Sequence, residues 1–250
     1  MNAHKLATTV LLASAALLLP AAAAAQEEMA PPSTGPSGYM ANRGLQFGAR
    51  VGYSLGAGSV YQGLNVTDAS NGQIPIQLDL GWRILPLLYV GAYGQFAPNF
   101  QKSNDMSCPN GLGCSAQDWR FGLEGDLHFL PRTRLDPYLG LSAGYEVLHT
   151  DESGTTTVPL PGGASASAPV GVSVTDRGWE FAALTLGFDA RVDRAVGIGP
   201  YLQASINEFN VHTGTETVNV AGMQTSTPVP QVSPAAHTIF TAGLRGTFNP

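Results

Sequence analysis

The sequence contains few charged residues and only two cysteines. Asp, Glu, Lys and Arg together make up 12% of its 250 residues, whereas soluble domains average about 25%. Too few charges are therefore present to cover the surface of a soluble domain of this size. The net charge of −6 at neutral pH argues against a nucleic-acid partner, because nucleic acids favour a basic surface.

Long apolar runs are missing except near the amino terminus. Residues 6–19 form an apolar run that is followed by Pro20, and Ala23, Ala24 and Ala25 precede Gln26. The run is shorter than the roughly 20 residues of a membrane-anchoring helix, but it has the length and flanks of a secretory signal peptide. We therefore predict a signal peptide over residues 1–25 and an exported mature chain, followed by a flexible segment over residues 26–43 that is rich in Pro, Ser and Gly.

From Gly44 onwards, apolar and polar residues alternate with a period of two, which is typical of strands with two different environments. The stretch from Trp119 to Phe129 is the clearest example, because its odd-numbered residues are mostly large and apolar and its even-numbered residues are mostly charged or small. The pattern predicts eight strands within a domain spanning 44–248, at residues 45–55, 74–84, 87–96, 119–129, 138–148, 181–193, 201–209 and 238–248.

The connections between these strands alternate in length. Links over residues 85–86, 131–137 and 194–200 are short, whereas those over 56–73, 97–118, 149–180 and 210–237 are long and rich in Gly, Ser, Thr, Pro and Asn. Short periplasmic turns alternating with long extracellular loops are typical of up-and-down membrane barrels. We therefore expect the long links to be exposed, mobile loops.

The polar face distinguishes a barrel in a membrane from a barrel in water. A soluble, lipocalin-like barrel would turn this face to solvent and would carry many Lys and Glu there, yet it consists mainly of Gly, Ser, Thr and Gln. Its charges occur in equal numbers of each sign, which predicts a network of paired charges in the lumen, because an unpaired buried charge costs several kcal/mol. The predicted network comprises Arg50, Asp79, Arg83, Arg120, Glu124, Asp126, Glu146, Asp189, Arg191 and Arg245.

Aromatic residues lie near both ends of the predicted strands, as in the interfacial girdles of membrane barrels. Near the short turns or the carboxyl terminus are Trp82, Phe129 and Phe248, and near the long links are Phe96, Trp119 and Phe209. Trp179 has the wrong parity for the outer face unless a bulge intervenes, so the sequence leaves it unassigned.

The signal peptide, the eight alternating strands and the segments at residues 89–94, 137–145 and 242–248 resemble small outer-membrane β-barrel proteins of the OmpA-transmembrane and OmpX type. The resemblance implies an all-β, eight-stranded antiparallel up-and-down transmembrane barrel in the outer membrane of a Gram-negative cell. It implies outer-membrane lipid and the barrel-assembly machinery as partners. It also implies that the machinery reads Phe248 as the aromatic end of the last strand.

Few residues suggest chemistry. Cys108 and Cys114 lie close together in a Gly-rich link of an exported chain, which predicts a disulfide. A metal site would need two further ligands nearby, and we expect neither a metal nor a cofactor. His128 lies beside Asp126 and Glu124, and His149 precedes Asp151 and Ser153, but no nucleophile, base and orienting acid share a strand face as a hydrolase requires.

The sequence thus predicts a non-enzymatic integral outer-membrane protein with a structural or surface-interaction role. The expected lumen is largely plugged by paired charges, because an eight-stranded barrel is only wide enough for side chains to fill. Three alternatives remain: a small porin-like channel, a lipid-modifying outer-membrane enzyme and a soluble lipocalin-like binding barrel. The pattern does not identify an extracellular ligand or an oligomeric state.

Overall fold

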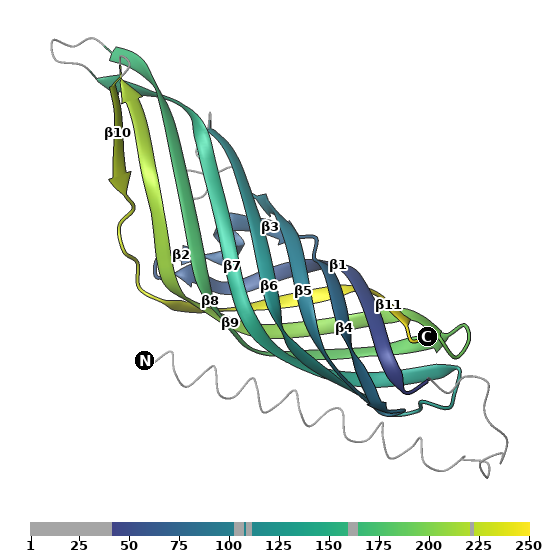
Figure 1. Cartoon of the computed structure of the whole chain (residues 1–250). Helices are drawn as coiled ribbons and strands as arrows, with labels where there is room; N and C mark the ends of the chain where they lie inside the picture. Colours follow the sequence, from purple (N-terminus) through teal and green to yellow (C-terminus); the bar gives the residue numbers. More distant parts are fainter. Residues whose placement is uncertain (1–41, 103–107, 109–111, 160–164, 221–222) are drawn as a thin grey trace. The chain divides into compact units, whose positions relative to one another are not determined.

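The computed structural model describes residues 42–102, 108, 112–159, 165–220 and 223–250. The predicted signal peptide lies outside the described residues, as does nearly all of the predicted N-terminal segment. Eight long antiparallel strands form a closed ring (Figure 1) because the last of them pairs with the first. In ring order they are β1 (Gly44–Tyr61), β4 (Ile76–Leu85), β5 (Leu88–Gln101), β6 (Leu112–His128), β7 (Leu135–Pro159), β8 (Ser165–Arg191), β9 (Val196–Val220) and β11 (Ala235–Phe248). The predicted eight-stranded antiparallel barrel is confirmed.

The long links contain much more β-structure than the sequence predicts. Strands β7 and β8 stay paired from Leu135–Ala190 up to Pro159–Ser165, and β9 continues to Val220, where it pairs with β10 (Met223–Pro228). The prediction that residues 149–180 and 210–237 are loops is therefore wrong for most of these residues. Hydrophobic alternation ends where neither face of a strand contacts lipid, but Thr and Val still favour extended backbone there, so pairing continues (Figure 1).

The other two long links also contain regular structure. Between β1 and β4 the chain forms β2 (Leu64–Asn65), the one-turn helix α3 (Val66–Ala69) and β3 (Ser70–Gln73), and β3 pairs with both β1 and β5. The 97–118 link begins as a continuation of β5 and ends as the start of β6. None of the helices among the described residues has the length and hydrophobicity needed to cross a membrane.

The barrel is apolar outside and polar inside, which is the reverse of a water-soluble protein. Large apolar side chains point outward from every strand of the ring, with exposed fractions as high as 69% for Leu123 and 65% for Leu78. Inside, Arg83, Asp136 and Asn207 are fully buried. An exposed apolar surface that surrounds the molecule fits the hydrocarbon of a bilayer. The lipocalin-like alternative is wrong, because the faces have the opposite orientation to the one it requires.

A β-bulge in β8 explains the position of Trp179. The register between β8 and β9 shifts between Glu180 and Ala182, and the extra residue reverses the alternation. As a result, Trp179 and Phe181 point outward on one side of the bulge, and Leu184 points outward on the other. The bulge also turns Glu180 into the lumen, where it is 4% exposed.

The aromatic residues at the strand ends follow the predicted girdles with one exception. Trp82, Phe129 and Phe248 are exposed near the short turns, and at the other end Trp119 packs on Phe96 with ring centroids 4.6 Å apart. The prediction for Phe209 is wrong. This residue lies at an inward position of β9, is buried, and stacks on the ring of His237.

Inward tyrosines pack on pairs of glycines that face each other across neighbouring strands. Gly122 of β6 is opposite Gly144 of β7, and a Cβ atom on Gly122 would lie 2.8 Å from the ring of Tyr93 and 2.2 Å from the carbonyl oxygen of Ala143. Gly52 and Gly243 form a similar pair next to Tyr201. The glycines therefore leave room for large rings inside a narrow barrel.

We predict that Gly122→Ala destabilises the barrel by about 1–3 kcal/mol, the usual cost of overpacking. Chemical unfolding of the purified protein in detergent, followed by tryptophan fluorescence, measures this change. Gly246→Ala is the matched control, because a Cβ atom there meets no atom within 4 Å. Equal stability of the two variants would contradict the proposed role of the glycine pair.

Candidate functional site

The lumen contains three clusters of charged side chains, and β6 contributes to each of them. Along this strand, Asp118 and Arg120 lie toward the long links, Glu124 and Asp126 lie in the middle, and His128 lies next to a short turn. All five side chains point inward because they share the parity that alternates with Trp119 and Phe121. The three clusters follow one another along the lumen.

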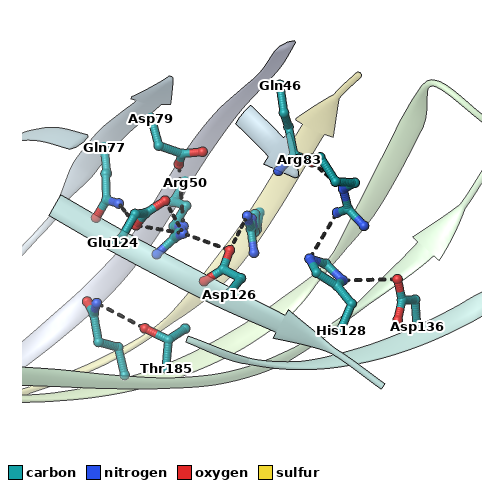
Figure 2. Close-up of polar contacts among 12 residues, drawn as sticks. Gln46, Arg50, Gln77, Asp79, Arg83, Glu124, Asp126, His128, Asp136 and Thr185 are labelled. Atoms are coloured by element: carbon teal, nitrogen blue, oxygen red, sulfur yellow. Dashed lines mark hydrogen bonds and ion pairs between the residues drawn. The ribbon is translucent and has the colours of Figure 1, made fainter. Parts of the chain in front are cut away.

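The turn-side cluster consists of Arg83, His128, Asp136 and Arg191, with Gln46 at its edge. Figure 2 shows Gln46, Arg83, His128 and Asp136 of this cluster. Arg83 contacts Gln46 Oε1 at 2.9 Å and His128 Nε2 at 2.9 Å. His128 Nδ1 and Arg191 Nη2 each lie 2.9 Å from Asp136 Oδ2. Because a guanidinium only donates hydrogen bonds, His128 accepts at Nε2 and donates to Asp136 from Nδ1. His128 therefore links the guanidinium of Arg83 to the carboxylate of Asp136.

The central cluster consists of Arg50, Asp79, Glu124, Asp126 and Arg245. Figure 2 shows Arg50 among three carboxylates, with its Nη2 3.0 Å from Glu124 Oε2 and its Nε 3.6 Å from Asp79 Oδ1. Arg245 Nη2 lies 2.6 Å from Asp126 Oδ2, and its guanidinium lies 4.5 Å from the centre of the Tyr138 ring. Arg50 also donates a hydrogen bond to Glu124, and charge-assisted hydrogen bonds of this kind are strong ones in proteins. The Arg245–Asp126 ion pair joins β11 to β6, which lie on opposite sides of the ring.

The mouth cluster consists of Asp118, Arg120, Glu146, Glu180 and His237. Arg120 Nη2 lies 2.6 Å from Asp118 Oδ2 and 2.7 Å from Glu146 Oε1, and its Nη1 lies 3.5 Å from Glu180 Oε2. His237 Nε2 lies 3.1 Å from Glu146 Oε2. A single arginine therefore serves three carboxylates, with one histidine beside them.

The structure buries all ten side chains of the predicted lumen network. Nine of them belong to the clusters just described: Arg50, Asp79, Glu124, Asp126 and Arg245; Arg83 and Arg191; Arg120 and Glu146. The tenth, Asp189, is fully buried, but its carboxylate oxygens have no hydrogen-bond partner among the described residues.

Sequence reasoning missed four buried carboxylates: Asp118, Asp136, Asp176 and Glu180. All four lie in segments that were predicted to be links. For Asp118 and Asp136 a signal existed, since each continues the inward parity of the strand beside it. With these four, the described residues bury nine carboxylates against five arginines. The predicted balance of charge is therefore wrong.

A cavity of about 140 Å³ lies on the long-link side of Arg120. Its polar lining includes Asp118, Glu146, Asp176 and His237, and residues 64–73 contribute part of its wall. Burial raises the pKa of Asp176, while the contact of its Oδ1 with His212 Nδ1 at 2.6 Å opposes the rise. We call this space the mouth cavity.

The remaining candidates lie outside the lumen clusters. Cys108 and Cys114 are joined by a disulfide, as predicted. His149 Nε2 lies 3.0 Å from Asp151 Oδ2 and its Nδ1 lies 3.0 Å from Thr175 Oγ1, with the histidine side chain 42% exposed. Among the described residues, no three His, Cys, Asp or Glu side chains group as metal ligands would.

No protein-family model matches the chain, and no curated protein matches its sequence. Solved structures do match. The chain is similar to Neisserial surface protein A, with 13% identity and a TM-score of 0.44 over 82% of this chain and 97% of that chain. It is also similar to a major outer membrane protein from Thermus thermophilus (11% identity, TM-score 0.49, 82% and 99% covered). A third match is the outer membrane protein OprG from Pseudomonas aeruginosa (10% identity, TM-score 0.42, 84% and 99% covered).

At such low identities the likeness concerns the fold alone. The ring of eight antiparallel strands, its apolar outer face and its charged lumen are properties of the chain itself. With these properties, the chain has the fold of the small outer-membrane β-barrel proteins.

Proposed function

We propose that this outer-membrane barrel is a non-enzymatic protein with a structural or surface-interaction role, and that its lumen is closed to free diffusion. The stacking of the three charge clusters along the lumen carries the proposal. Arg50 and Arg245 reach acidic partners on β4 and β6, and Arg120 reaches partners on β6, β7 and β8. Eight strands leave an interior only wide enough for side chains, so these contacts occupy the path that a solute would take.

The end of the barrel with the long links supports the interaction role. There the paired extensions of β7, β8 and β9, together with β10, form a continuous sheet beyond the apolar belt. The Cys108–Cys114 disulfide constrains the neighbouring link between β5 and β6. We assign this end to the outside of the cell, and we assign no cofactor, metal or nucleic-acid partner.

Phe248 supports a role for the carboxyl-terminal strand in assembly. Its side chain is 48% exposed on the outer face, and it pairs with Phe47 of β1 and Val196 of β9 at the closure of the ring. Asn249 holds the end of this strand, with its backbone N–H donating to Ala195 and its side-chain amide donating to Leu45. We propose that the barrel-assembly machinery recognises this aromatic strand end.

The membrane location generates a first prediction. Leu123→Arg, on the lipid-facing side of β6, should destabilise the barrel by about 2–4 kcal/mol if the residue lies near the bilayer midplane. Refolding into lipid vesicles, followed by heat-modifiable migration on gels, measures the folded fraction. Thr155→Arg, at an exposed position of β7 beyond the belt, should fold like the original protein. Equal folding of the two variants would place Leu123 in water rather than in lipid.

The closed lumen generates a second prediction. The unmodified protein in planar bilayers should show no sizeable single-channel conductance. The double variant Arg50→Ala with Glu124→Ala should conduct small ions, because it removes a bonded pair from the middle of the lumen. Asp79 loses its contact with Arg50 in this variant, so heat-modifiable migration on gels first verifies that the barrel is folded. Arg177→Ala with Glu216→Ala is the control, since both residues are exposed.

Two results would favour other functions. Sizeable currents through the unmodified protein would support the porin-like alternative. Hydrolysis of lipid or peptide substrates that is lost in His149→Ala would support an enzyme, because His149 contacts both an acid and a hydroxyl group.

A further inference from the structure

Three exposed arginines lie on two neighbouring turns at the short-turn end of the barrel. Arg132 and Arg134 belong to the turn between β6 and β7, and Arg194 belongs to the turn between β8 and β9. Strands β7 and β8 are paired, and the backbone N–H of Arg191 donates to the carbonyl oxygen of Arg134 over 2.8 Å, so the two turns are neighbours. We call Arg132, Arg134 and Arg194 the arginine rim.

The three guanidinium groups of the rim are available to a ligand. None of them has a hydrogen bond, an ion pair or a ring contact among the described residues. The acidic side chain of the second turn, Asp193, accepts hydrogen bonds from the backbone N–H groups of Ala195 and Val196 with its Oδ1. Because arginine keeps its charge in proteins, the rim has more positive charge than this single carboxylate can compensate.

Both turns are ordered by their own hydrogen bonds. The N–H of Thr133 donates to the carbonyl oxygen of Leu130 at 3.0 Å, and the N–H of Leu130 donates to Asp136 Oδ1 at 3.2 Å. In the second turn, the N–H of Val192 donates to the carbonyl oxygen of Val196 at 3.0 Å. The backbone of the rim is therefore ordered before a ligand binds, which lowers the entropic cost of binding.

The rim lies at the boundary of the lipid-facing belt. Leu135 follows Arg134 directly and is 56% exposed, and Val192, two residues before Arg194, is 67% exposed. The girdle residue Phe129 is the first residue after β6. Lipid headgroups surround an embedded barrel at the level of its aromatic girdles, and the long stem of an arginine extends from an apolar surface to its charged head. The rim therefore lies within reach of lipid phosphates.

The two ends of the barrel expose charges of opposite sign. Within the described ranges, the exposed charged side chains of the short-turn end are those of the rim, Arg43 and Asp193. Those of the long-link end are Asp68, Asp151, Arg177 and Glu216. Cations therefore predominate at the turns and anions at the long links. Basic clusters at a membrane surface attract anionic lipid, which favours the short-turn end.

We propose that the arginine rim binds the phosphate group of an anionic phospholipid, with the acyl chains of the lipid packed against Leu135 and Val192. A guanidinium fits because its parallel N–H groups donate two hydrogen bonds to one phosphate. A zwitterionic lipid fits less well, because the rim repels its ammonium group. With the long links outside the cell, the bound lipid belongs to the periplasmic leaflet. The site goes beyond the proposed structural role and does not depend on whether the lumen conducts.

Native mass spectrometry of the purified barrel in a neutral detergent tests the proposal, because it counts the bound lipids and measures their affinities. The probes are the anionic dioleoylphosphatidylglycerol, the zwitterionic dioleoylphosphatidylcholine, and sn-glycerol 3-phosphate, which has a phosphate but no acyl chains. One arginine near a membrane surface contributes roughly fivefold in affinity for anionic lipid. We therefore expect the first phosphatidylglycerol to bind at least about fivefold tighter than phosphatidylcholine. Glycerol 3-phosphate should not displace it, because it makes no apolar contacts.

Removal of the rim locates the binding. The triple variant Arg132→Gln, Arg134→Gln and Arg194→Gln should bind the two lipids equally, because glutamine keeps a polar side chain but has no charge. These side chains make no contact with the described residues, so the variant should fold, and heat-modifiable migration verifies this. A preference for phosphatidylglycerol that survives in the folded variant would overturn the proposal.

A matched control separates the rim from the net charge. The triple variant Thr155→Glu, Thr157→Glu and Thr215→Glu lowers the net charge by the same amount, at exposed positions on the extensions of β7 and β9. It should keep the preference for phosphatidylglycerol. If it lost that preference as fully as the rim variant, overall charge and not the rim would select the lipid.

Two further outcomes overturn the proposal. Equal affinity of the original protein for the two lipids would exclude selection of an anionic headgroup. Displacement of phosphatidylglycerol by glycerol 3-phosphate would indicate a site for free phosphate instead of lipid. Any of these results would leave the conductance measurements, and with them the proposed function, unaffected.

Discussion

Closure of the strand ring is the constraint on which the rest of the structure depends. Lipid offers no partner to a peptide N–H or C=O group, so a sheet that crosses a bilayer must satisfy all of these groups within itself. Here β11 pairs with β1 over twelve residue pairs, from Phe47–Phe248 to Gly58–His237. Because the outside of the closed wall must be apolar, the polar side chains have to lie inside. In so narrow a space they must bind one another or pack against glycines.

The number of arginines relative to carboxylates falls along the lumen, from the turn-side cluster to the mouth cluster. The turn-side cluster has two arginines for the carboxylate of Asp136, and the central cluster has two arginines for three carboxylates. At the mouth, Arg120 alone serves three carboxylates, with Asp176 nearby on the cavity wall. Asp79, Glu124, Asp126 and Asp136, deep in the lumen, each contact an arginine, which offsets the cost of burying their charge. Near the long links, His237 contacts Glu146 and His212 contacts Asp176.

The sequence predicts the wall of this barrel well because lipid enforces a strict alternation. Both parities of β6 follow from it, and so do the inward positions of Arg50 and Glu124. The inward and outward positions are predicted less well where the strands no longer contact lipid, because the alternation is lost there. Asp176 lies in a stretch where polar side chains occupy both faces of the strand and the pattern resembles a loop. Glu180 lies between the outward-pointing Trp179 and Phe181, next to the bulge that reverses the alternation of β8.

Other features depend on contacts that no single strand reveals. The bulge between Glu180 and Ala182 reverses the parity of β8, and the local sequence Phe181-Ala182-Ala183 has no polar residue that would indicate it. The mouth cavity is lined by residues 64–73 and by seven strands of the ring: β1, β5, β6, β7, β8, β9 and β11. The order of these strands along the chain does not specify which of their side chains meet at the cavity.

The closed ring has no edge strand, whereas the sheet formed beyond it by the extensions of β7, β8 and β9 with β10 has one at each side. Within the described ranges, β6 pairs with β7 no further than Leu112 with Gly154, and on the far side the described residues of β10 pair with β9 alone. Unpaired strand edges invite a further strand from another chain. The sheet beyond the lipid-facing belt therefore has edges that could pair with a strand of another chain, which the closed ring does not have. Pro228 limits such pairing at the end of β10, because it lacks the N–H group that a further strand would bind.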